Sequence, residues 1–259
     1  MRAFSCAAGS DLAGVRGRDA GSTTRRSGRQ ASDEVRMDSP GHYLAIPRRG
    51  SGPGVLVLHS WWGLNAFFRG VCDRLASQGF VALAPDLYDG RVAETARAAR
   101  ALRAASTARR REPIYKFLIR KIEYLRQHET VSSGELAQVG FSMGGHWACW
   151  LAQRPELPIA ATVSFYALRS GDYSRTRSAF LCHLAEDDPW VSAPVTRKLA
   201  RHLEAVGVQA TFHNYPGTGH WFFESDRAEA FEPGAAALAW TRTVAFLRAH
   251  LRHRAGRGR

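Results

Sequence analysis

Short apolar runs recur along the chain from residue 43 onward, and longer segments of mixed polarity separate them. Runs of this length, rich in Val, Leu, Ala and Phe, are typical of strands that are buried on both faces of a parallel sheet. Tyr43–Ile46 is a further candidate, which we expect to form a leading edge strand. The six core runs are Val55–His59, Phe80–Ala84, Ala137–Gly140, Ile159–Phe165, Phe180–Leu184 and Ala210–Tyr215.

Hydrophobic residues between these runs recur at helical spacing. Phe67, Val71 and Leu75 lie four residues apart, which places them on one face of a helix directed toward a core. Two further apolar stripes predict two more helices in the second half of the chain. They are Val195, Leu199 and Leu203 in one, and Leu238, Trp240, Val244, Leu247 and Leu251 in the other.

The stretch 93–127 is also expected to be helical, with a break at Pro113. Proline breaks a helix because it lacks the backbone N–H that a helix interior needs. The arginines of this stretch are expected to form a solvated face rather than a binding site. They are Arg97, Arg100, Arg103, Arg109, Arg110 and Arg111.

Strands that alternate with helices indicate an α/β fold with a mostly parallel central sheet and helices on both faces. We expect residues 38–251 to form this domain. Residues 1–37 are rich in Arg, Ser, Gly and Asp, so they cannot bury enough apolar surface to offset their ordering entropy. They are expected to be a disordered basic leader, and residues 252–259 a basic C-terminal tail.

The composition is that of a globular domain, since hydrophobic residues make up 45% of 259 residues. No apolar run approaches the roughly 18 residues of a membrane span, and the amino terminus does not have the pattern of a secretory signal. We therefore expect a cytoplasmic protein without a membrane partner.

The net charge of +13 is concentrated at the two ends of the chain. Residues 1–36 and 248–259 supply +8 of it, which leaves only +5 for the body of the protein. Basic ends of this kind bind phosphate weakly, and no motif of interleaved aromatic and basic residues is present. No specific nucleic-acid partner is expected, and the sequence does not indicate an oligomeric state.

The scattered cysteines and histidines do not indicate a metal site. Cys6, Cys72, Cys149 and Cys182 form no CxxC pair, which argues against a zinc site and against a disulfide framework. Cys149 and Cys182 lie in apolar surroundings and are expected to be buried thiols. Four histidines lie in or beside predicted elements, where a structural role is usual, so no metal or other cofactor is expected. They are His59, His146, His183 and His213.

The segment Gly140-Phe141-Ser142-Met143-Gly144 directly follows a predicted strand. This G-x-S-x-G pattern between a strand and a helix predicts a sharp turn that presents the serine hydroxyl as a nucleophile. The glycines would remove side-chain collisions at the turn, and the first N–H groups of the helix would face an oxyanion. Glycine-rich loops are common, so the motif alone does not distinguish a nucleophile from a loop serine.

An acid and a histidine follow this serine in the order that a hydrolytic triad on a parallel sheet requires. The strand Phe180–Leu184 runs into an acidic cluster that contains Asp188, and Ala210–Tyr215 runs into a glycine-rich loop that contains His220. Catalytic groups collect at the carboxyl ends of such strands. We expect Asp188 to orient His220, which deprotonates Ser142 and later protonates the leaving group.

The loop after the first core strand is expected to supply a second donor to the oxyanion. The backbone N–H of Trp61 is the candidate, beside that of Met143. The indoles of Trp61 and Trp62, with those of Trp190 and Trp221, either line an acyl pocket or pack in the core.

Together these motifs resemble the dienelactone hydrolase family, a compact branch of the α/β-hydrolases, from about Tyr43 to Leu251. The resemblance rests on G-V-L-V-L-H-S-W-W-G-L-N, Q-G-F-V-A-L-A-P-D-L-Y, G-F-S-M-G-G, D-D-P-W-V and Y-P-G-T-G-H. It implies an α/β-hydrolase fold that hydrolyses small esters or lactones without a metal or organic cofactor. It also implies that Asp188, rather than Asp187, is the acid.

The chain departs from the family pattern at several positions. Ser142 stands where the family has a cysteine, and Ser60 where it has a glutamate. A serine cannot be held as an anion as a thiol can, so it needs His220 throughout. Where the family has an arginine that grips the substrate carboxylate, this chain has Glu224, which we expect to repel an anionic lactone. Arg91 is the nearest candidate for a second substrate arginine.

We interpret the chain as an α/β-hydrolase that cleaves small esters or lactones through an acyl-serine intermediate. A large cap domain is not expected, because only about 14 residues separate Phe165 from Phe180. Arg91, Trp62 and Trp221 are the predicted substrate-binding residues. The alternative is a non-catalytic binding protein with this fold and basic tails, which would need no triad.

Overall fold

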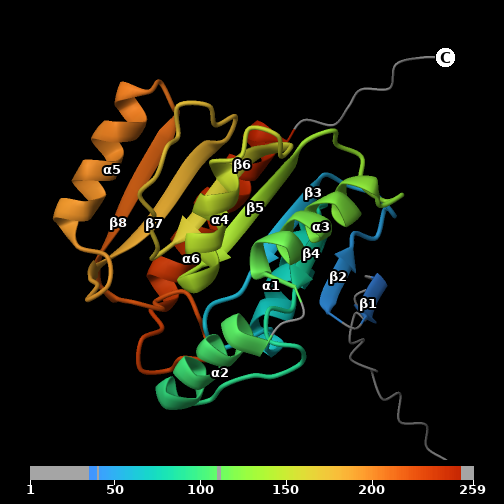
Figure 1. The fold of residues 1–259 in the computed structure, drawn as a ribbon, viewed down its shortest axis with the longest axis horizontal. Helices are drawn as coiled ribbons and strands as arrows, with labels where there is room; N and C mark the ends of the chain where they lie inside the picture. The colour runs from blue at the N-terminus through green and yellow to red at the C-terminus, as the bar shows by residue number, and fades with distance from the viewer. Residues whose placement is uncertain (1–34, 40, 110–111, 252–259) are drawn as a thin grey trace, which may run out of the picture. The chain divides into compact units, whose positions relative to one another are not determined.

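A mostly parallel sheet of eight strands has the order β1-β2-β4-β3-β5-β6-β7-β8 (Figure 1). The structure is a computed structural model, and it describes residues 35–39, 41–109 and 112–251. β2 is antiparallel to both of its neighbours, and the other neighbouring strands are parallel. The strands are β1 (Val35–Ser39), β2 (His42–Ile46), β3 (Gly54–Leu58), β4 (Val81–Pro85), β5 (Leu136–Phe141), β6 (Ile159–Phe165), β7 (Ala179–Asp187) and β8 (Ala210–Gly219).

Helices cover both faces of this sheet. In the part of the chain that the structure describes, they are α1 (Ala66–Ser77), α2 (Ala96–Arg109), α3 (Ile114–Gln127), α4 (Met143–Ala152), α5 (Ala193–Ala205) and α6 (Pro233–His250). One hydrophobic cluster joins α1 and α6 to one face of the sheet. Two other clusters join α3, α4 and α5 to the strands from the opposite face. None of these described helices is long and apolar enough to cross a bilayer.

The six predicted strands are confirmed as β3 to β8, but β8 is not a buried core strand. It lies at the edge of the sheet, and only Tyr215 and Thr218 of its residues are buried. In β3, Val55 and Val57 pack in the cluster with α1, whereas Leu56 and Leu58 pack in the cluster with α3 and α4. A parallel sheet covered on both sides buries successive side chains on opposite faces. The inner strands therefore consist of nearly continuous apolar runs, which is why the sequence predicted them.

The leading strand lies inside the sheet rather than at its edge. Tyr43–Ile46 corresponds to β2, and β1 pairs with it on the outer side. Residues 35–37 of the predicted leader belong to β1, while the rest of the leader and the tail 252–259 lie outside the described residues. An edge strand pairs on one side only and needs no apolar run, so composition alone did not indicate β1.

The predicted helical stripes are correct in place but wrong at two residues. Val195 in α5 is 52% exposed, although Leu199 and Leu203 are buried as expected. Leu238 in α6 is 46% exposed, because α6 turns smaller side chains toward the sheet. Its buried residues are Ala236, Ala239, Thr243, Val244 and Leu247.

The break predicted at Pro113 is confirmed, since α2 ends at Arg109 and α3 begins directly after the proline. Ala99 of α2 packs against Trp62 and Ala93 in a small cluster of their own. Trp62 follows β3, so α2 lies beside the loop in which the oxyanion donor was predicted.

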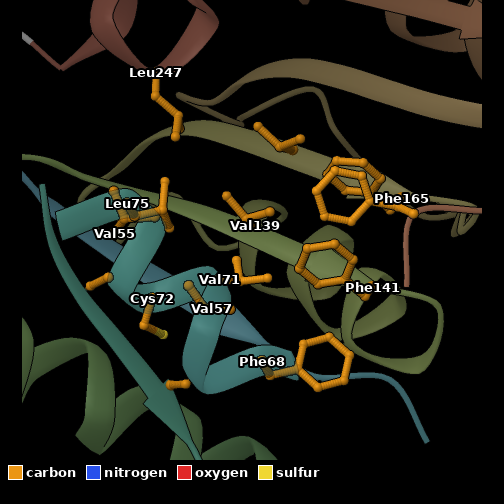
Figure 2. Packing of buried hydrophobic residues seen from close by; sticks show 14 of the residues in the cluster. Val55, Val57, Phe68, Val71, Cys72, Leu75, Val139, Phe141, Phe165 and Leu247 are labelled. Carbon is orange, nitrogen blue, oxygen red and sulfur yellow. The ribbon is translucent and has the colours of Figure 1, made fainter. Parts of the chain in front are cut away.

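Aromatic packing fixes the strand ends that carry the predicted site. The rings of Phe141 and Phe165 stack with their centroids 4.7 Å apart, and that of Phe68 lies 5.3 Å from Phe141 (Figure 2). Phe141 and Phe165 are the last residues of β5 and β6, so they directly precede Ser142 and Tyr166. Their burial anchors the points from which these two side chains emerge.

Candidate active site

Ser142 lies at the turn between β5 and α4 in a backbone conformation that residues with side chains rarely adopt. Its φ is 49° and its ψ is −112°. Two glycines allow the close approach at this turn. A Cβ on Gly144 would overlap the carbonyl oxygen of Leu58, and a Cβ on Gly140 would overlap the backbone of Gly144. This is the physical reason for glycine at both ends of the G-x-S-x-G pattern.

The structure brings the three predicted catalytic side chains into one hydrogen-bonded chain. Ser142 Oγ and His220 Nε2 are 2.8 Å apart, and so are His220 Nδ1 and Asp188 Oδ2. The side chain of Asp188 is fully buried, and only 5% of the side chain of His220 is exposed. When Nδ1–H donates to the carboxylate, Nε2 is free to accept the serine proton.

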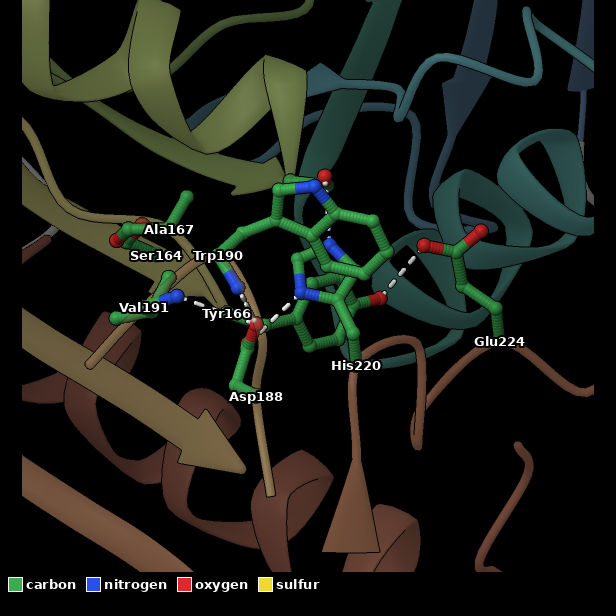
Figure 3. Close-up of polar contacts among 9 residues, drawn as sticks. Ser164, Tyr166, Ala167, Asp188, Trp190, Val191, His220 and Glu224 are labelled. Carbon is green, nitrogen blue, oxygen red and sulfur yellow. Dashed lines mark hydrogen bonds and ion pairs between the residues drawn. The ribbon is translucent and has the colours of Figure 1, made fainter. Parts of the chain in front are cut away.

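Two backbone groups hold the carboxylate of Asp188 (Figure 3). Its Oδ1 accepts hydrogen bonds from the N–H of Trp190 at 2.9 Å and of Val191 at 3.2 Å. Its Oδ2 therefore stays directed at His220. Asp187, at the end of β7, is exposed instead.

The loop after β3 is held by a buried histidine. His59 Nε2 accepts a hydrogen bond from the N–H of Leu87 at 3.1 Å, so its Nδ1 carries the proton and donates to the carbonyl of Ser60 at 2.6 Å. This bond fixes the backbone just before Trp61.

A nucleophile, a base, an orienting acid and adjacent N–H groups together suit acyl transfer.

A cavity of about 180 Å³ opens beside Ser142. Both predicted oxyanion residues, Trp61 and Met143, line it, and so does the predicted binding residue Trp221. Trp62, which was also predicted to bind substrate, is buried and is not among the described lining residues. Its ring lies 5.4 Å from that of Trp61 and 5.3 Å from that of Trp221. The described lining residues are Trp61, Arg103, Ser142, Met143, His146, Tyr166, Trp190, Val191, His220 and Trp221.

The arginine at the cavity is not the one predicted. Arg91 is absent from the described lining residues, and its Nε donates to the carbonyl of Tyr88 instead. Arg103 of α2, which we expected on a solvated face, lines the cavity. Helical spacing shows which face of α2 is polar, but it does not show what that face borders.

Glu224 does not face the substrate, contrary to our expectation that it repels anions. Its side chain is fully buried, and its Oε2 accepts a hydrogen bond from Ser60 Oγ at 3.0 Å. Its Oε1 accepts a hydrogen bond from Tyr166 Oη at 2.7 Å (Figure 3). Burial raises the pKa of this carboxyl to about 8. The raised pKa favours the protonated form, so this carboxyl adds less negative charge near the cavity than an exposed glutamate would.

Tyr166 lies at the site, although the sequence did not predict it there. It directly follows β6, lines the cavity, and its ring centroid lies 4.8 Å from that of His220. A polar aromatic residue at the carboxyl end of a predicted strand was the available signal, since that edge of the sheet carries the other site residues.

Two of the remaining histidines differ in environment. His183 is buried in β7 and contacts Tyr215 Oη at 2.7 Å and Thr243 Oγ1 at 3.0 Å, and burial lowers its pKa. It has the structural role that we expected, whereas His146 of α4 lines the cavity. Among the described residues, no group of three or more His, Cys, Asp or Glu side chains is arranged to hold a metal ion.

Comparison with known proteins identifies one family and several relatives. A family model described as the dienelactone hydrolase family matches residues 41–251. The protein named Protein usf from Aquifex pyrophilus is 32% identical over 216 residues, which cover 81% of this chain and 93% of that protein. A carboxymethylenebutenolidase from Pseudomonas putida is 27% identical over 223 residues, which cover 80% and 90% of the two chains.

The fold is similar to solved structures as well. A structure named m3DLH superposes with a TM-score of 0.72 at 26% identity, and the match covers 85% of this chain and 98% of the other. The similarity thus extends over most of this chain and nearly all of the other.

Proposed function

Because the chain belongs to the dienelactone hydrolase family, we propose that it hydrolyses small carboxylic esters and lactones through an acyl intermediate on Ser142. The main support for this mechanism is the geometry of Ser142, His220 and Asp188. The distances of 2.8 Å from Ser142 Oγ to His220 Nε2 and from His220 Nδ1 to Asp188 Oδ2 form an unbroken path for one proton.

In this mechanism His220 takes the proton of Ser142 as the hydroxyl attacks the ester carbonyl. The N–H groups of Met143 and Trp61 stabilise the negative charge on the carbonyl oxygen. His220 then donates its proton to the leaving alcohol, and the acyl group stays on Ser142. A water molecule, deprotonated by the same imidazole, releases the acid in the second half of the cycle.

The size of the cavity supports a small substrate. A volume of about 180 Å³ lies below the roughly 300–1,000 Å³ of typical drug-sized ligand sites. The connection from Phe165 at the end of β6 to Ala179 at the start of β7 is short, which leaves little chain for a cap.

The partner and location assignments stay predictions. The basic excess lies mostly at the two ends of the chain, which supports a hydrolase domain without a specific nucleic-acid partner. A cytoplasmic location and the absence of a membrane partner are proposed from the sequence alone. A non-catalytic binding protein is not favoured, since it would not need Ser142, Asp188 and His220 in hydrogen-bonded order.

The test is turnover of p-nitrophenyl acetate by Ser142→Ala protein. We expect a loss of at least about 10⁴-fold in kcat, because the nucleophile and its proton path are removed together. Ser174→Ala is the matched control, since Ser174 is exposed and does not line the cavity. Turnover by Ser142→Ala at the rate of this control would remove Ser142 from the mechanism.

A further inference from the structure

Three tryptophans from three separate loops form one wall of the cavity. Trp61 follows β3, Trp190 follows β7 and Trp221 follows β8, and all three line the cavity with Ser142. The rings of Trp61 and Trp221 are stacked, with centroids 5.7 Å apart and an angle of 23°. The ring of Trp190 lies 5.2 Å from that of Trp221 and 6.4 Å from that of Trp61.

Packing does not explain the position of Trp190. The residue is 55% exposed, so its indole contributes much less to the core than a buried ring does. A large aromatic side chain that stays exposed beside a reactive serine is instead typical of a surface that binds a ligand.

The wall lies on the leaving-group side of the reaction. The ring centroid of His220 is 4.5 Å from that of Trp190 and 4.9 Å from that of Trp221. The leaving oxygen must come within hydrogen-bond distance of His220 Nε2 to receive its proton. The group attached to that oxygen therefore lies next to Trp190 and Trp221.

We propose that this tryptophan wall is a leaving-group subsite for flat aromatic alcohols, so that esters of phenols are the preferred substrates. The proposal rests on the proposed function. The Oγ–C bond forms at Ser142, the bond between the acyl carbon and the aryl oxygen breaks, and the phenol leaves with the proton that His220 took from Ser142. Water then converts the acyl-enzyme to the carboxylic acid and restores the serine.

The size of the expected preference for aryl esters follows from the stacking of an aryl ring on the indole of Trp190. Aromatic pairs of this geometry change binding by roughly 2- to 12-fold beyond the area that they bury. An alkyl group of similar size gains the burial but not the stacking. The ring should therefore raise kcat/KM for an aryl ester relative to an activated alkyl ester.

The test compares phenyl acetate with 2,2,2-trifluoroethyl acetate, an activated ester without a ring. The readout is the ratio of their kcat/KM values, in which the intrinsic reactivity of each ester cancels between variants. We expect Trp190→Leu to lower this ratio by roughly 3- to 10-fold. Trp190→Phe, which keeps an aromatic face, should restore most of it. Tyr115→Leu is the control, because Tyr115 is an exposed aromatic residue that does not line the cavity.

An equal loss of kcat/KM for both esters in Trp190→Leu would overturn the subsite. It would mean that the substitution disturbs His220 and not the binding of the leaving group. An unchanged ratio would overturn it too. If wild-type protein turned over neither ester, the proposed function would fail and the subsite with it.

Inhibition of ester hydrolysis by free alcohols completes the test. Phenol should inhibit the wild-type protein more strongly than cyclohexanol does, and Trp190→Leu should remove that difference. Equal inhibition of wild-type protein by the two alcohols would contradict an aromatic subsite.

Discussion

Strained backbone is concentrated at the cavity beside Ser142. Four residues other than glycine have positive φ in the described chain, and Ser142, Tyr166 and Trp221 are three of them. All three line the cavity. Each such residue costs on the order of 1–3 kcal/mol, which the surrounding structure must offset. The fold is therefore less stable than it would be without this strain, which directs these three side chains into the cavity.

Glu224 should make the stability of the protein depend on pH in an unusual direction. Its pKa is raised from 4.5 to about 8, chiefly by burial. The folded state therefore keeps a proton that the unfolded state has lost. The stabilisation from this proton is complete below pH of about 4.5 and is lost as the pH rises through about 8.

We expect Glu224→Gln protein to lose this dependence. In the wild-type protein the contribution to the free energy of unfolding should fall by up to about 1.4 kcal/mol per pH unit between these values. Urea unfolding at several pH values from 5 to 8 measures the free energy of unfolding of each protein. The readout is the difference between the two proteins in the slope of this free energy against pH. Parallel curves for the two proteins would show that Glu224 is not protonated in the folded state.

The motif residues could be predicted from the sequence, but the role of Glu224 could not. Ser142 and His220 were found because each follows a strand in a glycine-rich turn. The partners of Glu224 are Ser60, 164 residues away, and Tyr166, 58 residues away. No local pattern encodes contacts at that separation, and so a carboxylate expected to face the substrate turned out to be buried.

At the scale of elements, the turn from β5 to α4 should tolerate no side chain at Gly144. Because a Cβ there would overlap the carbonyl oxygen of Leu58, Gly144→Ala should lower the free energy of unfolding by about 1–3 kcal/mol. Gly70→Ala is the matched control. Gly70 lies in α1 with open space around it, so alanine there should be neutral or stabilising by up to about 1 kcal/mol.

Chemical denaturation of the two variants gives the comparison. If Gly144→Ala were as stable as Gly70→Ala, the close approach of α4 to β3 would not be the reason for glycine in the motif.

Strands could be predicted more fully than helix faces. In β3, Val55 to Leu58 are apolar at every position because both faces of the strand are covered, and the signal is therefore strong. The stripe assigned to α6 followed the largest side chains and included Leu238. Val244 and Leu247 of that stripe are buried as predicted. Ala236 and Ala239 take the place of Leu238, since small residues allow closer approach.

At the scale of the whole molecule, sheet topology assembles the site. Ser142, Asp188 and His220 follow β5, β7 and β8, which run parallel, so that their carboxyl ends meet at one edge. Their order along the chain and the strand periodicity predicted this convergence. The identity of the arginine at the cavity depended on where α2 packs, which no periodicity specifies.

Mapping the covalent adduct of a fluorophosphonate is the most direct test of the acyl-Ser142 mechanism. Wild-type protein is inactivated with the reagent and digested, and mass spectrometry locates the modified residue. We expect one adduct, on Ser142 in the peptide that contains G-F-S-M-G-G, at a stoichiometry that matches the activity lost. Inactivation with the adduct on any other residue, or full modification of Ser142 with activity retained, would contradict the account.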